Sequence, residues 1–268
     1  MVSTKKIGFI GCGKMAGAII KGIVKSSLIS ANNILASKSN PENLEETSKK
    51  LGIRITLDNK EIMKFGDIIF IGVKPSQVSA VLEEIKAFVT ADKIIVSMAA
   101  GVKISQIENI LQSTKVIRIM PNTPVLVNEG MTGICRGKGV SEKDLEQICS
   151  IFDSIGKSVV VEENQIDIVT AISGSGPAFF YKVMNDIARA GEKLGLDYEK
   201  ALLLSIQTAI GSAKMALDRK ISMEELISNV ATKGGCTRVG VDIMEEIHTD
   251  KIFAKVIEKT TEKAKGLG

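Results

Sequence analysis

Residues 6–22, which read KIGFIGCGKMAGAIIKG, decide the fold of the first half of the chain. A short apolar run, residues 7–10, ends at two glycines, Gly11 and Gly13, and a segment with helical apolar spacing follows. Strand, tight glycine turn and helix are the context that a G-x-G-x-x-G/A phosphate loop requires. Gly11 permits the turn, Gly13 lets the backbone approach a pyrophosphate, and Ala16 is the small third residue where helix and strand pack. The stretch predicts a dinucleotide site, with the amides at the helix start facing the phosphates.

Strand-like and helix-like segments then alternate as far as about residue 161. The segment 67–73, DIIFIGV, is nearly all apolar, as expected for a strand buried on both faces of a parallel sheet. This alternation predicts an α/β fold, a Rossmann-like doubly wound sheet that binds its ligand at the carboxyl ends of the strands. The predicted strands are residues 7–10, 33–37, 53–56, 67–73, 93–97, 115–120, 131–135 and 158–161.

The residues after the second predicted strand bear on the choice of cofactor. An NAD site usually carries Asp or Glu there, about 20 residues past the loop, on the ribose hydroxyls. The chain instead reads Ser-Lys-Ser-Asn over residues 37–40, so a carboxylate is missing and the cation of Lys38 is present. A cation suits a 2′-phosphate, and we therefore expect NADP(H) to be preferred, with NAD(H) possible. The alternative is that Lys38 is an ordinary solvated lysine.

No further strand signal follows residue 163. Helices are predicted over residues 166–194, 197–217, 222–231, 237–248 and 251–265. We expect two domains, 1–163 and 164–268, the second all-helical. Residues 201–217, ALLLSIQTAIGSAKMAL, are apolar or small around most of a helix, and such a helix must be buried on all sides. An intertwined dimer would bury it, and the alternative is the central helix of a monomeric bundle.

The composition is that of an ordinary globular protein, with 268 residues of which 44% are hydrophobic and 25% charged. No apolar run approaches the roughly 18 residues of a membrane span, and the N-terminus has no apolar export signal. A net charge of +4 with 4% aromatics does not favour nucleic acid. Four cysteines without a C-x-x-C pair indicate reduced thiols rather than zinc or disulfides. We expect a cytoplasmic protein that binds no membrane, nucleic acid or metal.

Two glycine-rich stretches interrupt the helical half. Residues 173–178, SGSGPA, lie inside an otherwise helical pattern, and either a kink or a close backbone approach would explain them. Residues 232–237, TKGGCT, lie between two helices. Paired glycines before a helix start, Gly234 and Gly235, make a nest of N–H donors that fits a small carboxylate. The alternative is a simple turn between helices.

Six motifs occur together and in a fixed order. They are GCGKM at residues 11–15, Val-Lys-Pro at 73–75, AAGV at 99–102, MPNTP at 120–124, SGSGPA at 173–178 and Gly-Gly-Cys-Thr at 234–237. Together they resemble pyrroline-5-carboxylate reductase, the enzyme that makes L-proline, over essentially the whole chain. The resemblance implies an NADP-binding Rossmann domain and a helical dimerisation domain. It also implies a homodimer that assembles further, often to a decamer.

The resemblance assigns roles by position in this sequence. It implies contacts to 1-pyrroline-5-carboxylate at Glu163, Cys236 and Thr237, beside the nest at Gly234 and Gly235. The family's loop usually reads Ser-Pro-Gly-Gly-Thr-Thr; here Lys replaces the Pro and Cys the first Thr, which leaves the nest and Thr237 intact. Cofactor contacts are implied at Gly11, Cys12, Gly13, Lys14, Met15, Lys38, Asn59, Val73, Lys74, Pro75, Met98, Ala99, Ala100 and Asn229.

Such a reaction requires few catalytic side chains. Reduction of a cyclic imine needs hydride on carbon and a proton on nitrogen, and a protonated imine is already an electrophile. The protein must mainly align two ligands, and orientation alone can supply about 7–11 kcal/mol. Thr237 is the candidate that hydrogen-bonds the ring nitrogen, directly or through water, and no metal or histidine base is required. We interpret Cys236 as a contact residue rather than a nucleophile.

Two other functions fit part of the pattern. A β-hydroxyacid dehydrogenase of the 6-phosphogluconate dehydrogenase type shares the two-domain plan. That family places a catalytic Lys four residues after the last Gly of its helix motif, where this chain has Phe180. Lys182 lies about 200° further around the helix, which argues against this function. The third possibility is a reductase-like protein that binds NADP without turnover, which the altered residues Lys233 and Cys236 keep open.

Overall fold

The computed structural model describes residues 2–112, 114–218 and 220–266. The chain forms two compact units, one of Met1–Ser175 with Thr260–Gly268 and one of Gly176–Lys259. This division falls later than residue 163, where the strand signals stop. The reason is that the segment after residue 163 packs on the first unit, where Ile166 and Ala171 are fully buried.

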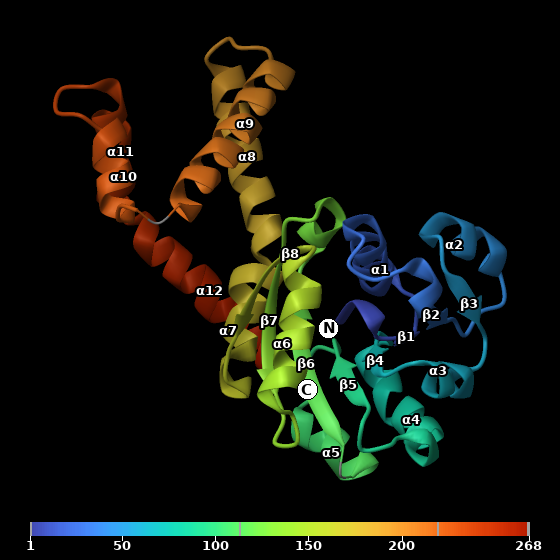
Figure 1. Ribbon diagram of the computed structural model, residues 1–268. Helices are drawn as coiled ribbons and strands as arrows, with labels where there is room; N and C mark the ends of the chain where they lie inside the picture. Colours follow the sequence, from blue (N-terminus) through green and yellow to red (C-terminus); the bar gives the residue numbers. More distant parts are fainter. Residues whose placement is uncertain (1, 113, 219, 267–268) are drawn as a thin grey trace. The chain divides into compact units, whose positions relative to one another are not determined.

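The first unit is built on an eight-stranded sheet in the order β3-β2-β1-β4-β5-β6-β7-β8 (Figure 1). The strands from β1 to β6 are parallel, β7 is antiparallel to β6, and β8 is parallel to β7. The order 3-2-1-4-5-6 is that of the doubly wound Rossmann sheet, so the predicted fold class is confirmed. The strands are β1 Ile7–Ile10, β2 Ile34–Ser37, β3 Arg54–Thr56, β4 Ile68–Ile71, β5 Ile94–Ser97, β6 Lys115–Pro121, β7 Gly130–Arg136 and β8 Gly156–Val160.

Helices cover both faces of this sheet, because alternate residues of its central strands enter two separate cores. Phe9 and Phe70 belong to one core together with α1 and α6, and their rings stack at 4.7 Å. Ile10 and Ile71 belong to the other core, with α3, α4 and α5. The apolar run after Asp67 is thus buried on both faces, as predicted. The helices are α1 Lys14–Ser26, α2 Leu44–Leu51, α3 Asn59–Phe65, α4 Pro75–Ile85, α5 Ile104–Leu111, α6 Glu142–Asp153 and α7 Ile166–Val169.

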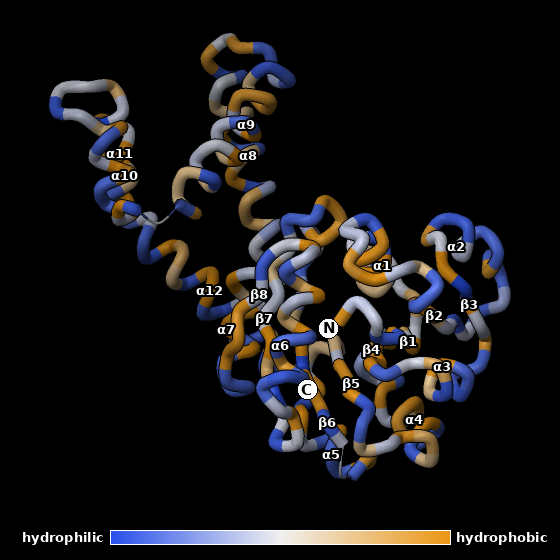
Figure 2. Tube along the Cα trace, in the orientation of Figure 1, coloured by the Kyte–Doolittle hydropathy of each residue, from blue (hydrophilic) through white to orange (hydrophobic). Residues whose placement is uncertain are grey.

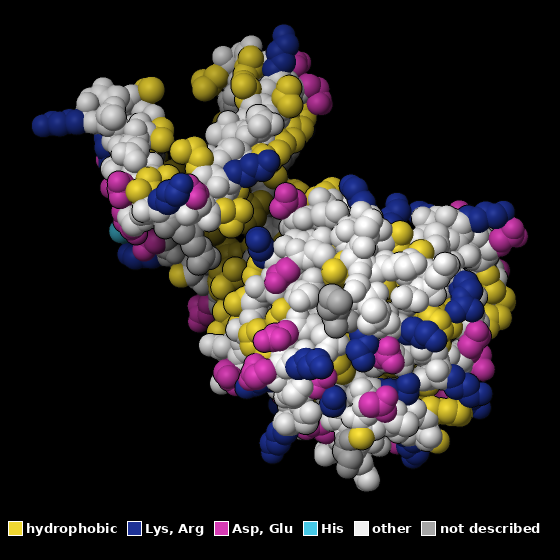
Figure 3. Space-filling model, viewed as in Figure 1, with side chains coloured by type: hydrophobic (Ala, Val, Ile, Leu, Met, Phe, Trp, Pro, Cys, Tyr) yellow, Lys and Arg dark blue, Asp and Glu magenta, His cyan; other side chains and the backbone are white. Residues whose placement is uncertain are grey.

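The second unit is helical and exposes much apolar surface. Its helices are α8 Gly176–Lys193, α9 Tyr198–Leu217, α10 Met223–Val230, α11 Cys236–Glu246 and most of α12 Thr249–Lys265. The side chain of Asp197 caps α9, as predicted. Along α9, Leu203 is 67% and Leu204 60% exposed, and apolar residues gather on these helices (Figures 2 and 3). Apolar faces of this extent mark an interaction surface.

One predicted helix is wrong. The sequence predicts a single helix over residues 166–194, but the chain forms α7, a π-helical turn over Thr170–Gly174, and then α8. In the turn, the amide of Ser175 donates to the carbonyl of Thr170 at 2.8 Å. Pro177 is the second residue of α8, where a missing N–H group costs no helical hydrogen bond. Within the described ranges, none of the helices has the length and apolarity needed to span a bilayer.

Candidate functional site

The phosphate loop lies at the point where the sheet order reverses, between β1 and β4. Gly11 has φ +88°, a conformation that side chains rarely adopt. A Cβ at Gly11 would lie 2.7 Å from Cγ1 of Val73 and 3.0 Å from the backbone of Gly72. The helix is also close to the strand at Ala16, which is fully buried. Its Cβ atom would lie only 3.3 Å from a Cβ built on Gly72, so a small residue is needed here. These contacts explain two of the three small residues of the predicted loop.

Gly13 has a different explanation. A Cβ placed on Gly13 would meet nothing within 4 Å, so the packing of the chain does not require glycine there. Among the described residues, none accepts a hydrogen bond from the backbone amides of Lys14, Met15 or Ala16, and the first turn of α1 contains no acid. The open space and the three free donors fit the pyrophosphate of a dinucleotide.

Lys38 follows β2, directly after Ser37, whose hydroxyl accepts a hydrogen bond from the Gly11 amide of this loop. Its ammonium donates to the hydroxyl of Thr47 at 3.0 Å and to the carbonyl of Glu42 at 3.5 Å, and it forms no ion pair with any described carboxylate. Burial raises the pKa of the Cys12 thiol in the loop, and the positive charge of Lys38 opposes that rise. Lys38 is therefore a positioned cation whose charge no acid neutralises, as a 2′-phosphate site requires.

Two further residues, Ser37 and Glu84, are connected by hydrogen bonds to the predicted residues Gly11 and Asn59. Neither of the two was predicted from the sequence. The Gly11 amide donates to Oγ of Ser37 at 3.3 Å, and this hydroxyl donates to Oδ1 of Asn59 at 2.6 Å. Nδ2 of Asn59 donates to Oε2 of Glu84 at 2.9 Å. A signal for Ser37 was present, since it is a polar residue at the end of an otherwise apolar strand. No local pattern pointed to Glu84.

The other predicted cofactor residues line the ends of β4 and β5. Lys74 occupies the N-cap position of α4, where its backbone carbonyl accepts from the Gln77 amide, and Pro75 is the first residue of the helix, where proline fits best. The amide of Met98 donates to the carbonyl of Ile71 at 3.3 Å, which joins the segment after β5 to the end of β4. Val73 and Ala100 are half-buried and Ala99 is buried. These segments lie at the carboxyl edge of the sheet beside the loop, as predicted.

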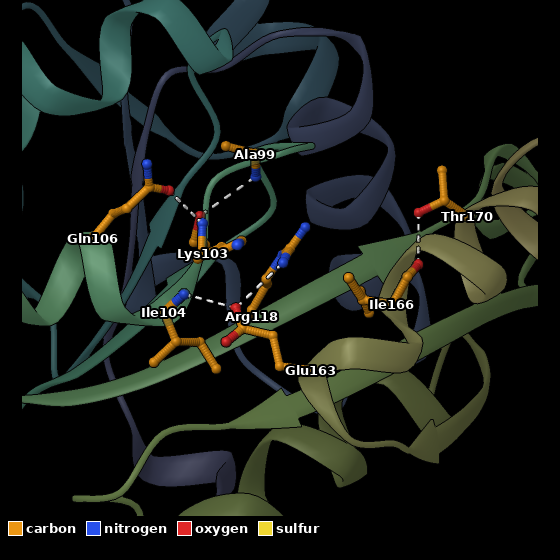
Figure 4. A network of polar contacts seen from close by, with 9 residues as sticks. Ala99, Lys103, Ile104, Gln106, Arg118, Glu163, Ile166 and Thr170 are labelled. Atoms are coloured by element: carbon orange, nitrogen blue, oxygen red, sulfur yellow. Dashed lines mark hydrogen bonds and ion pairs between the residues drawn. The ribbon is translucent and has the colours of Figure 1, made fainter. Parts of the chain in front are cut away.

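Glu163 is held inside the first unit by two contacts (Figure 4). Its Oε1 accepts from the amide of Ile104 at 2.7 Å and from Nη1 of Arg118 at 3.2 Å. Arg118 lies on β6 with its side chain only 4% exposed. The carboxylate therefore stabilises the N-terminus of α5 and neutralises a buried guanidinium. A contact from Glu163 to the substrate stays a prediction.

The loop of Gly234 to Thr237 belongs to the second unit. Gly234 has φ +79°, and Gly235 is the N-cap of α11. A Cβ on Gly235 would lie 3.0 Å from Oγ1 and 3.2 Å from the carbonyl oxygen of Thr232. In the described part of the chain, no residue accepts from the backbone amides of Gly234, Cys236 or Thr237. The predicted nest thus has three free donors at a helix start.

Three comparisons with known proteins agree with these features. Residues 163–267 match a model of pyrroline-5-carboxylate reductase dimerisation, and residues 6–101 match one of NADP oxidoreductase, coenzyme F420-dependent. A pyrroline-5-carboxylate reductase of Methanosarcina acetivorans is 38% identical over all 268 residues, 99% of that relative. The chain belongs to the pyrroline-5-carboxylate reductase family.

Solved structures of this family have the same fold. The reductase of Coxiella burnetii superposes with a TM-score of 0.93 at 33% identity, with 99% of both chains covered. The Plasmodium falciparum pyrroline carboxylate reductase, solved with NADP bound, gives a TM-score of 0.87 at 32% identity and the same coverage. The predicted family is therefore confirmed over the whole chain.

The remaining residues that the reductase family implies lie on exposed parts of the second unit. Asn229 is exposed on α10. Cys236 is exposed as the first residue of α11, whereas Cys12 and Cys149 are half-buried and Cys135 is buried. Thr237 also lines an apolar cavity of about 310 Å³ between α9, α10 and α11, beside Ser212. Gly234, Cys236 and Thr237 are exposed, and Gly235 between them is half-buried.

Proposed function

We propose that the chain is a pyrroline-5-carboxylate reductase, which transfers a hydride from NADPH to the imine carbon of 1-pyrroline-5-carboxylate and yields L-proline. Membership of this family over the full length carries the proposal, and the phosphate loop with its unneutralised Lys38 supports it. We infer that residues 1–163 hold the cofactor and residues 164–268 the substrate and the dimer contacts. The reaction is proposed to take place in the cytoplasm.

Each part of the proposed site has a distinct task. NADPH supplies the hydride when it is bound. The free amides of α1 hold the pyrophosphate and Lys38 the 2′-phosphate. The free amides of the loop at Gly234 hold the substrate carboxylate, so that the imine carbon is presented in one orientation. The hydroxyl of Thr237 donates a hydrogen bond to the ring nitrogen, directly or through water, and so assists the protonation that makes the imine electrophilic.

Purified protein incubated with 1-pyrroline-5-carboxylate and NADPH tests this proposal. We expect NADPH consumption that depends on the substrate, with one L-proline formed per NADPH. An NADP-binding protein without turnover would bind the cofactor in a calorimeter and leave both reactants unchanged.

Lys38→Asp is expected to reverse the cofactor preference. The wild-type protein should have a higher kcat/KM with NADPH than with NADH, because Lys38 faces the 2′-phosphate. The new carboxylate repels that phosphate and suits the ribose hydroxyls of NADH. The ratio of the two kcat/KM values measures the effect. Lys50→Asp makes the same charge change at an exposed position on α2 and should leave the ratio unchanged; an unchanged ratio in Lys38→Asp would reject the role of Lys38.

The uncovered apolar faces of the second unit indicate a homo-oligomer, and the match to the dimerisation model supports it. We infer a dimer through the helical unit that assembles further to a decamer. Light scattering at micromolar protein should give a mass near ten times the subunit mass of 28.7 kDa. Leu203→Glu places a charge on the apolar face of α9 and should lower that mass, whereas Lys200→Glu at the start of the same helix should not. A wild-type protein that is active as a monomer would contradict the dimer.

A further inference from the structure

A chain of hydrogen bonds runs beneath the cofactor loop and connects four elements of the first unit. It starts at the amide of Gly11 after β1, passes through Ser37 at the end of β2 and Asn59 at the start of α3, and ends at Glu84 on α4. Ser37 is only 2% exposed, whereas Glu84 is exposed to solvent. Among the described residues, Glu84 accepts a hydrogen bond from Asn59 and from neither Ser37 nor the loop, so Asn59 connects it to the loop.

The carboxylate at one end decides the direction of every bond in this chain. An ionised carboxylate only accepts hydrogen bonds, so Asn59 must turn its amide nitrogen towards Glu84. The carbonyl oxygen of Asn59 then faces Ser37, and the Ser37 hydroxyl donates to it. This leaves the lone pairs of the Ser37 oxygen for the amide of Gly11, which can only donate.

We propose that Ser37 and Glu84 are positioning residues for the cofactor. Ser37 anchors the residue at the tightest point of the phosphate loop, and Glu84 fixes the orientation of Asn59 and of the Ser37 hydroxyl. Together they hold Gly11 in the conformation that directs the free amides of α1 at the pyrophosphate. Neither side chain touches reacting atoms. Their loss therefore weakens NADPH binding without slowing the chemical step at saturating cofactor. The inference rests on the proposed NADPH site but not on the identity of the reduced substrate.

A double-mutant cycle on NADPH affinity tests this inference. The dissociation constant of NADPH is measured by calorimetry, without substrate, for the wild type, Ser37→Ala, Glu84→Ala and the double variant. We expect Ser37→Ala to raise this constant roughly tenfold, as the loss of a buried hydrogen bond predicts, and Glu84→Ala, which removes the acceptor for Asn59, to raise it by a smaller factor. The double variant should bind about as weakly as Ser37→Ala alone, because both changes act on one chain of bonds.

Glu83→Ala is the matched control, since Glu83 is the neighbouring exposed acid on α4 and pairs only with Lys86 in the described chain. It should bind NADPH as the wild type does. Glu84 is exposed, so Glu84→Ala tests the inference even where Ser37→Ala lowers the melting temperature. In turnover assays, Ser37→Ala and Glu84→Ala should raise the KM for NADPH and keep kcat.

Two results would overturn the inference. One is unchanged NADPH affinity in Glu84→Ala, and the other is that the effects of Ser37→Ala and Glu84→Ala on the dissociation constant multiply in the double variant. A wild type that binds no NADPH would overturn the inference and the proposed function together. A wild type that binds NADPH but forms no proline would reject only the proposed reaction.

Discussion

Gly235→Val is expected to remove proline formation while NADPH binding stays close to that of the wild type. The backbone of Gly235 is extended, a conformation that valine also adopts, so the substitution causes no backbone strain. The Cβ of the new side chain, however, would lie 3.0 Å from Oγ1 and 3.2 Å from the carbonyl oxygen of Thr232, and its two methyl groups need further space beside the loop amides, so we expect the loop to shift. The free amides of Cys236 and Thr237 then move from the position of the substrate carboxylate. A misplacement of about 1 Å can cost roughly 10²-fold in rate, and we expect at least that loss.

Gly240→Ala is the control for Gly235→Val. Gly240 lies in α11, and a Cβ there would meet nothing within 4 Å, so a methyl group fits without displacing the loop. The control should keep its turnover. NADPH affinity, measured by calorimetry, should stay intact in both variants because the phosphate loop belongs to the first unit. Full activity in Gly235→Val would reject the carboxylate nest.

Thr237→Ala is expected to lower kcat by about 10²-fold or more, the low end for a positioned proton donor. The substitution removes the hydroxyl and leaves the backbone amides of the loop in place. The KM for 1-pyrroline-5-carboxylate should therefore change much less than kcat. Thr237→Ser keeps the hydroxyl and should recover most of the rate. A Thr237→Ala enzyme with near-normal kcat would show that the proton reaches the ring nitrogen without this residue.

Cys236→Thr separates this account from cysteine catalysis. The exchange restores the residue that the family usually carries and removes the thiol, and it should be tolerated. Loss of turnover in Cys236→Thr would instead indicate a thiol nucleophile. Cys236 is the exposed cysteine of the described chain, whereas burial raises the pKa of Cys135 to about 12 and raises the pKa of Cys12 and Cys149 as well.

The parts of this molecule that local sequence determines were predictable. Apolar runs such as the one after Asp67 predicted the buried strands, because a strand covered on both faces needs apolar side chains at every position. Gly11 and Ala16 predicted the tight turn between β1 and α1, and Lys38 was placed near the loop by its position after β2. Each of these signals lies within one element or one connection.

Contacts between distant elements were not predictable in the same way. The bond from Asn59 to Glu84 and the pair of Arg118 with Glu163 join residues that no periodicity relates. Glu163 was assigned to the substrate by resemblance alone, and its contacts to Ile104 and Arg118 became visible only in the folded chain. The π-helical turn before Ser175 was also not predicted, because the spacing of apolar residues does not distinguish such a turn from a continuous α-helix. The glycines and the proline of residues 173–178 indicated that the helix is interrupted there, but not that the interruption is a π-helical turn.

Transfer of a labelled hydride tests the central claim most directly. The protein is incubated with 1-pyrroline-5-carboxylate and NADPH that carries deuterium at one or the other of the two C4 positions of the nicotinamide, and the proline is analysed by mass spectrometry and NMR. We predict that one of the two labelled cofactors delivers a single deuterium to the former imine carbon and that the other delivers none. Proline without deuterium from both cofactors, or no proline at all, would contradict direct hydride transfer by this chain.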